Sequence, residues 1–171
     1  MTSHEMQAAR WLPAYVALGS NLEDPVQQVL RAFDALGDLP RTRLVLRSSL
    51  YRSAPLGPVA QPDFVNAVAG VLTQLEAQEL LDELKALETR LGRVTPAVRW
   101  GPRLIDLDLL AHGNSRIASE SITVPHSGIA ERAFVLVPWA EVCPSLEVAG
   151  VGRVGVLARR LGAAGLQRIE A

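Results

Sequence analysis

The sequence predicts an α+β fold, a ferredoxin-like split βαβ sandwich in which an antiparallel sheet has helices packed on it. Segments with alternating apolar residues and segments with apolar residues at three- and four-residue spacing follow one another as strand, helix, strand, strand, helix, strand. The two central strands have no helix between them, which disfavours a doubly wound parallel sheet. With 171 residues the chain fits one domain. We expect residues 1–12 to be a flexible leader and residues 13–171 to be a single domain.

The first third of the chain supplies a strand, a helix and a second strand. The continuous apolar run 14–18 is typical of a strand buried on both faces, and Gly19-Ser20-Asn21 then forms a turn. A capping residue and a proline, Asp24-Pro25, predict the start of a helix that ends at Gly37. Residues 43–51 alternate and predict one long strand.

A proline-rich loop precedes the next strand. Residues 53–62 contain three prolines and one glycine, which exclude regular structure, and loops of this length are more often functional than not. Residues 64–73 then alternate as a strand that places Phe64 and Asn66 on one face. An aromatic ring beside a carboxamide suits a flat, polar-edged heterocycle, although ordinary packing is the alternative.

The second helix contains a carboxylate in an unusual place. Thr73 and Glu76 predict a capping box at its start, leucines form its buried stripe, and Gly92 ends it. Glu88 lies near the C-terminal end, where the helix dipole does not favour a carboxylate. Either Glu88 contacts a ligand or it is a surface glutamate.

The most informative stretch is 99–110, Arg-Trp-Gly-Pro-Arg-Leu-Ile-Asp-Leu-Asp-Leu-Leu. The alternation from residue 104 onwards predicts a strand with Asp106 and Asp108 on one face and Cα atoms about 6.7 Å apart. Two such carboxylates could hold a pair of metal ions about 3.5–4 Å apart, or they could simply be the solvated face of a strand. Arg103 stands at the entrance of this strand, and Arg99 and Trp100 lie on the loop before it. Together these residues suit binding of metal ions and phosphate.

The last third is less regular. A turn at 112–114 and extended segments over 117–124 lead to Pro125-His126, and His126 precedes Arg132 and Phe134. The apolar run 134–142 contains a proline and fits either a short helix or an extended segment. Residues 153–161 predict a final helix.

Composition excludes several classes of function. The net charge is −1, so no overall field attracts nucleic acid or an anionic membrane. The single cysteine, Cys143, excludes an intrachain disulfide and a cysteine-based zinc cluster. No apolar run reaches the ~18–20 residues that span a bilayer, and the first dozen residues lack the apolar core of a signal peptide. We expect a cytoplasmic protein with small-molecule partners.

The chain resembles the 6-hydroxymethyl-7,8-dihydropterin pyrophosphokinase family of the folate pathway, from about residue 14 to about residue 144. The matching motifs follow one another in the family's order: Ala17-Leu18-Gly19-Ser20-Asn21, Tyr51-Arg52-Ser53-Ala54-Pro55-Leu56-Gly57, Gln61-Pro62-Asp63-Phe64-Val65-Asn66-Ala67, Leu91-Gly92-Arg93, Arg99-Trp100-Gly101-Pro102-Arg103-Leu104-Ile105-Asp106-Leu107-Asp108 and Val124-Pro125-His126. The segment from Arg99 to Asp108 is the most specific of them.

This resemblance implies transfer of the β,γ-diphosphate of ATP to the hydroxymethyl group of the pterin, with release of AMP, by a monomeric enzyme. It implies two Mg²⁺ ions on Asp106 and Asp108, and Arg93 and Arg103 as the catalytic phosphate clamp. Arg99 and Trp100 are implied to lie on a mobile loop that closes over the substrates. The implied pterin-binding residues are Ser53, Ala54, Leu56, Phe64, Asn66, Trp100 and Phe134. The implied ATP-binding residues are Glu88, Arg93, Arg99, Trp100, Arg103, Thr123, His126 and Arg132.

The sequence departs from the family's pattern at a few positions. Phe64 stands where many members have tyrosine, so stacking is kept and a hydroxyl contact is lost. Ser121 and Ser127 replace arginine and tyrosine found near the nucleotide in some members. Two other functions remain open: a ferredoxin-like small-molecule-binding module without catalysis, and another Mg-dependent nucleotidyl or phosphoryl transferase.

Overall fold

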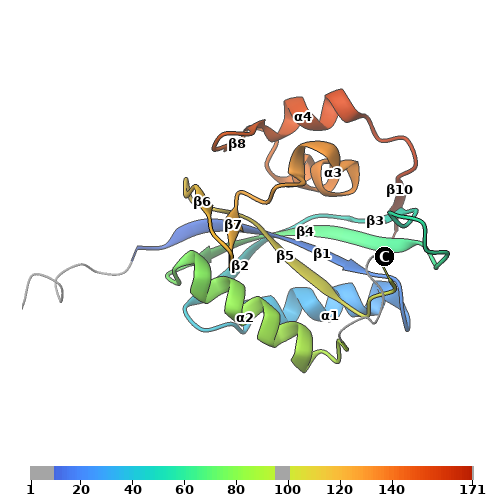
Figure 1. Cartoon of the computed structure of the whole chain (residues 1–171), viewed down its shortest axis with the longest axis horizontal. Helices are drawn as coiled ribbons and strands as arrows, with labels where there is room; N and C mark the ends of the chain where they lie inside the picture. Colours follow the sequence, from blue (N-terminus) through green and yellow to red (C-terminus); the bar gives the residue numbers. More distant parts are fainter. Residues whose placement is uncertain (1–9, 95–100, 171) are drawn as a thin grey trace, which may run out of the picture.

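A computed structural model of the chain describes residues 10–94 and 101–170 (Figure 1). Its main sheet has six strands in the order β10-β3-β4-β1-β5, with β2 also paired to β4, and every pairing is antiparallel. The strands are β1 (Leu12–Ser20), β2 (Thr42–Arg47), β3 (Leu50–Ser53), β4 (Phe64–Thr73), β5 (Asp106–His112) and β10 (Gln167–Ile169). If β2 and β3 are taken as one interrupted strand, the order of the first four strands is that of the ferredoxin-like fold, and the predicted fold class is confirmed.

Strand β1 lies in the middle of the sheet. It pairs with β4 from Leu12↔Thr73 to Ser20↔Val65, and with β5 from Ala14↔His112 to Gly19↔Asp106. The predicted buried strand at 14–18 is therefore confirmed, and it is longer than expected at both ends. Leu12, which we had expected in the leader, already belongs to β1.

Helices α1 (Pro25–Gly37) and α2 (Ala77–Arg90) cover one face of the sheet, as predicted (Figure 1). Phe33 from α1 and Leu80 and Leu84 from α2 are buried against that face. The Asp24 side chain caps α1 by accepting a hydrogen bond from the Gln27 N–H. These two helices and the sheet enclose the larger hydrophobic core.

The capping box of α2 differs from the prediction. Glu76 and Glu79 form it, and the Glu76 N–H donates to the Glu79 carboxylate at 3.1 Å. Thr73 is the last residue of β4, and its hydroxyl accepts from the Leu75 N–H at 3.1 Å. The prediction was wrong because the strand runs to Thr73 and the helix begins only at Ala77.

Helices α3 (Ala133–Val142) and α4 (Val154–Leu161) lie on the opposite face of the sheet (Figure 1). Leu136 and Trp139 of α3 are fully buried in a second core with Tyr15 and Leu110 of the sheet and Val154 of α4. The ambiguous run 134–142 is thus helical, with Pro138 inside it. Helices α3 and α4 thus cover much of this face of the sheet.

The predicted long strand over 43–51 is divided at Ser48-Ser49 into β2 and β3. The Ser48 hydroxyl accepts from the Val68 N–H at 2.8 Å, and the Ser48 N–H donates to the Val68 carbonyl at 2.9 Å. The Glu141 carboxylate of α3 accepts from the Ser49 N–H at 2.9 Å. Side-chain bonds therefore replace part of the regular ladder at this point.

Short elements complete the chain. The hairpin β6 (Ile117–Ala118)–β7 (Thr123–Val124) follows β5, and a 3₁₀ turn (Ile129–Glu131) precedes α3. A second hairpin, β8 (Glu147–Val148)–β9 (Gly152–Arg153), leads into α4, and the predicted final helix is confirmed. Over residues 10–94 and 101–170, no helix has the length and apolar character to cross a membrane.

We expect Leu136→Ala to destabilise the fold strongly, because Leu136 is 0% exposed in the second core. Removing a buried leucine side chain costs about 2–5 kcal/mol, which lowers the melting temperature of a domain of this size by at least ~5 °C. Differential scanning calorimetry measures this change. Val45→Ala is the control, since Val45 is 49% exposed on β2 and its truncation leaves no cavity. Equal melting temperatures for the two variants would contradict the second core.

Candidate active site

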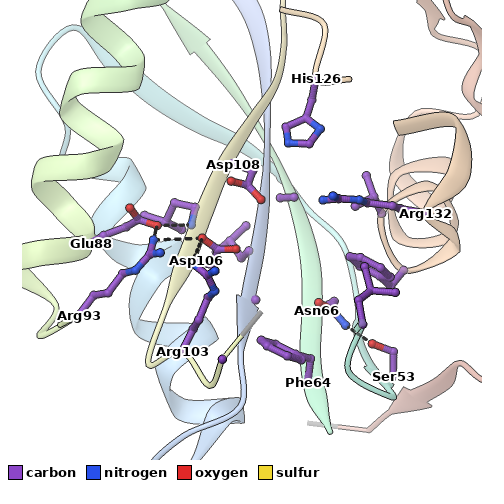
Figure 2. Close-up of a pocket in the computed structure, with 18 of the residues that line it drawn as sticks. Ser53, Phe64, Asn66, Glu88, Arg93, Arg103, Asp106, Asp108, His126 and Arg132 are labelled. Carbon is purple, nitrogen blue, oxygen red and sulfur yellow. Dashed lines mark hydrogen bonds and ion pairs between the residues drawn. The ribbon is translucent and has the colours of Figure 1, made fainter. Parts of the chain in front are cut away.

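A pocket of about 390 Å³ opens at one end of the sheet, between α2 on one side and α3 on the other (Figure 2). Strands β1, β4 and β5 form its floor. The pocket contains nearly all of the predicted site residues that the structure describes: Ser53, Ala54, Leu56, Phe64, Asn66, Glu88, Arg93, Arg103, Asp106, Asp108, His126, Arg132 and Phe134.

The two aspartates lie on one face of β5, as the alternation predicted. Asp106 and Asp108 are half-buried, whereas their neighbours Leu107 and Leu109 are buried in the core. On β1 the residues opposite are Gly19 and Ala17, which also line the pocket. Gly19 has no side chain and Ala17 has only a methyl group, so the space in front of both carboxylates stays open.

Arg93 and Glu88 join α2 to the start of β5. Arg93 Nη1 donates to Glu88 Oε2 and, at 3.1 Å, to Asp106 Oδ1 (Figure 2). Glu88 Oε2 also accepts from the Leu107 N–H at 2.8 Å, and the residue is only 7% exposed. The alternative of a surface glutamate is therefore wrong. Arg103 Nη1 lies 4.0 Å from the same Asp106 oxygen, so Asp106 stands between two guanidinium groups.

Negative charge accumulates on the inner side of this cluster. Burial, with the charges of Asp106 and Glu88, raises the pKa of Asp108 to about 7, although the charges of Arg132 and Arg103 act in the lowering direction. Burial likewise raises the pKa of Glu88. Burial, followed by the nearby charge of Arg132, lowers the pKa of His126. A cation bound beside Asp108 would relieve this repulsion.

The chemistry of the donors fits Mg²⁺, which prefers carboxylate and phosphate oxygens and keeps several waters. Within the described part of the chain, no group of three or more histidine, cysteine, aspartate or glutamate side chains could hold a metal ion. Two aspartates alone supply too few oxygen ligands to complete the coordination of a magnesium ion. A magnesium ion here would need oxygens from a bound phosphate or from water to complete its coordination.

The opposite half of the pocket floor is aromatic and uncharged. Phe64 and Asn66 share one face of β4, and Asn66 Nδ2 donates to the Ser53 hydroxyl at 2.7 Å (Figure 2). A Cβ atom at Gly19 would lie 3.2 Å from Asn66 Oδ1, so glycine keeps this part of the floor open. Phe134 lines the pocket from the first turn of α3. A planar ligand with polar edges fits these groups.

One predicted residue that the structure describes does not line the pocket. Thr123 is exposed in β7. Arg99 and Trp100 fall outside the described residues. Ser121, one of the departures from the family's pattern, donates to Gln78 Oε1 at 2.9 Å.

Sequence reasoning missed several residues of the pocket. Among them is Lys85, which lies one turn before Glu88 on α2 and is the only lysine in the chain. The three-residue spacing from Glu88 was a signal for it. Ala17, Leu18, Gly19, Leu81, Gly101, Leu107 and Val135 also line the pocket. Their small or apolar side chains gave no signal of their own.

The fold and the pocket together define a ferredoxin-like domain whose site suits a polyphosphate on one side and a flat heterocycle on the other. The family model described as 7,8-dihydro-6-hydroxymethylpterin-pyrophosphokinase matches residues 15–144, most of the chain. The chain belongs to this family. The resemblance drawn from the sequence is confirmed, and so is the expected class of enzyme, a pyrophosphokinase of folate biosynthesis.

Individual relatives agree with the family. A 2-amino-4-hydroxy-6-hydroxymethyldihydropteridine pyrophosphokinase of Haemophilus influenzae is 49% identical over 135 residues, which cover 79% of this chain and 84% of that protein. The Pseudomonas aeruginosa protein of the same name is 50% identical over 134 residues, covering 78% of this chain and 82% of that protein. A crystal structure of Plasmodium falciparum HPPK-DHPS with pteroate superimposes with a TM-score of 0.75 at 13% identity over 96% of this chain, which spans 47% of that longer one. This last likeness shows the fold.

We expect Asp108→Asn to stabilise the protein in a buffer without divalent cations. The pKa of Asp108 is about 7 in the folded state against 3.8 ordinarily, so the native state binds the proton more tightly than the unfolded state does. Wild-type stability therefore falls as the pH rises from about 4 to about 7, whereas asparagine carries no charge at any pH. The variant's advantage in melting temperature should grow across this window to at least ~2 °C at pH 8.

Thermal melts at pH 5 and pH 8 in the presence of EDTA measure this difference. Asp82→Asn is the matched control, because Asp82 is exposed on α2 and its Oδ1 only accepts from Gln78. The difference between that control and the wild type should stay the same at both pH values. An Asp108→Asn protein that melts below the wild type at pH 8 would contradict the described electrostatics.

Proposed function

We propose that this chain transfers the β,γ-diphosphate of ATP to the hydroxymethyl group of 6-hydroxymethyl-7,8-dihydropterin, giving the pterin diphosphate and AMP. The observation that carries the proposal is one pocket with two halves. Arg93, Arg103, Asp106 and Asp108 form a charged half, and Phe64 and Asn66 form a half suited to a heterocycle. Such a pocket can hold a polyphosphate next to a flat acceptor, which is the arrangement that diphosphate transfer needs.

In this proposal Asp106 and Asp108 hold two Mg²⁺ ions together with oxygens of the ATP phosphates. When bound, these ions neutralise phosphate charge and polarise the phosphoryl oxygens. The raised pKa of Asp108 supports the assignment, because a partly buried carboxylate close to two other carboxylates is stabilised by a cation. Asp106 has a second role, since it also orients Arg93 at 3.1 Å.

Arg93 and Arg103 act as the phosphate clamp. The guanidinium group suits bidentate contact with phosphate oxygens, and both side chains are only partly exposed at the pocket. The oxygen of the acceptor hydroxyl attacks the β-phosphorus and gives up its proton to water. The bond from that phosphorus to the α-phosphate oxygen breaks, and AMP leaves with that oxygen. The two arginines hold the phosphates in line for this displacement and stabilise the charge that develops on them.

The remaining assignments follow the two halves of the pocket. Phe64 and Phe134 stack on the pterin, and the Asn66 carboxamide reads its polar edge with the backbone of Ser53, Ala54 and Leu56. At the ATP end we assign Glu88, His126 and Arg132; His126 acts as a neutral ring because burial lowers its pKa. Arg99, Trp100 and Thr123 remain predictions from the resemblance. We also propose a monomeric cytoplasmic enzyme that acts on small molecules alone.

Incubation with MgATP and 6-hydroxymethyl-7,8-dihydropterin should yield AMP and the pterin diphosphate in equal amounts, because the displacement occurs at the β-phosphorus. Chromatographic separation of AMP, ADP and the pterin products measures this. ADP as the nucleotide product would overturn the diphosphate transfer and favour another phosphoryl transferase. Asp108→Asn, which keeps the fold, should form AMP at least ~100-fold more slowly because it loses a metal ligand.

A further inference from the structure

A buried carboxamide directly after β1 connects three segments of the chain. Asn21 is 2% exposed and is not among the residues that line the pocket. Its side chain nevertheless bonds to the segment that carries Arg103 and to the end of the proline-rich loop. The oxygen and both hydrogens of this one amide are used, in three of the four hydrogen bonds that a carboxamide can form.

On the phosphate side, Asn21 holds both backbone groups of Arg103. The Asn21 N–H donates to the Arg103 carbonyl at 3.0 Å, and the Arg103 N–H donates to Asn21 Oδ1 at 2.8 Å. The regular pairing of β1 with β5 ends earlier, at Gly19↔Asp106. The backbone from which the Arg103 side chain reaches the pocket is therefore fixed by Asn21, beyond the end of the ladder.

On the heterocycle side, Asn21 Nδ2 donates to Gln61 Oε1 and to the Pro62 carbonyl, both at 2.9 Å. Pro62 stands two residues before Phe64, the first residue of β4. The pairing of β1 with β4 ends at Ser20↔Val65, so this connection also lies past the end of the ladder. The Asn21 side chain thus bonds to the backbone segment that carries Arg103 and to the segment that leads to Phe64, one for each half of the pocket.

We infer that Asn21 is a positioning residue, which sets the separation between Arg103 and the aromatic half of the pocket. This inference rests on the proposed function, because that separation matters only if a phosphate and a heterocycle must meet. No other residue type of this length has one acceptor and two donors on the same planar group. Aspartate keeps the acceptor for the Arg103 N–H and loses both donors, and alanine loses all three bonds.

The two variants should therefore have different kinetic effects. In Asn21→Asp the carboxylate faces the Gln61 and Pro62 oxygens, which frees the proline loop while Arg103 stays bonded. We expect the KM for the pterin to rise at least ~10-fold and the KM for ATP to change less than ~3-fold. In Asn21→Ala, Arg103 also loses the bond from its N–H and keeps only the bond from its carbonyl to the N–H of residue 21. We expect kcat to fall a further ~10-fold or more, because small misplacements of a clamp are costly.

Steady-state kinetics with each substrate varied in turn measures this split, and calorimetric titration with 6-hydroxymethylpterin reads the pterin affinity without turnover. Thr42→Val is the matched control. Thr42 is buried at the start of β2, where its hydroxyl bonds to the Pro40 carbonyl and the Thr73 hydroxyl. Its loss should lower the melting temperature and leave kcat and both KM values within ~2-fold of the wild type, because Thr42 does not line the pocket.

The possible results separate the inference from the proposed function. A wild-type protein that forms no AMP would overturn the proposed function. A wild-type protein that forms AMP, with an Asn21→Asp variant whose pterin KM and affinity match those of Thr42→Val, would overturn the positioning role alone. Equal losses for ATP and the pterin in Asn21→Asp would also overturn it, since they indicate a general loss of structure.

Discussion

The hydrogen bonding of β1 along both of its edges is the constraint on which the site depends. Gly19 pairs with Asn66 of β4 on one edge and with Asp106 of β5 on the other. Neighbouring strands lie about 4.8 Å apart, so the carboxamide and the carboxylate arise from backbones about 10 Å apart. Gly19 lies between them without a side chain of its own. The width of the pocket floor, and with it the spacing of a heterocycle from a phosphate, is thus a property of the sheet.

The carboxylates in the charged half of the pocket repel one another and so destabilise the folded protein. Asp106, Asp108 and Glu88 lie close enough together to raise the pKa of Asp108, and Arg93 compensates Glu88 and Asp106 first. A folded protein without ligands carries this repulsion at neutral pH. Binding sites commonly keep such unfavourable groups because the ligand supplies the missing partner. Glu88 offsets part of this destabilisation, because its carboxylate accepts a hydrogen bond from the Leu107 N–H and so connects the end of α2 to β5.

Features set by local signals could be predicted from the sequence. The period of two placed Asp106 and Asp108 on one face, and Asp24-Pro25 marked the start of α1. Features set by distant contacts could not be predicted in this way. The break between β2 and β3 depends on bonds of Ser48 and Ser49 to Val68 and Glu141, and β10 adds to the sheet far along the chain. Asn21 likewise appeared to be an ordinary turn residue, because its partners lie about 40 and 80 positions away.

The layer formed by α3 and α4 explains why the pocket is closed on the side opposite α2. A run that is apolar on every side has no preferred face, so the sequence of α3 did not indicate that it lies between the sheet and another helix. Leu136 and Trp139 are buried in the second core, where α3 packs against β4 and Trp139 lies against Tyr15 of β1, and this packing fixes where the helix begins. The residues around that beginning, Arg132, Phe134 and Val135, all line the pocket. Because the first turn of a helix favours negative charge, Arg132 and the helix dipole act in the same direction here. The second core therefore contributes to the site as directly as the strands do, by holding a cationic helix start opposite the carboxylates of β5.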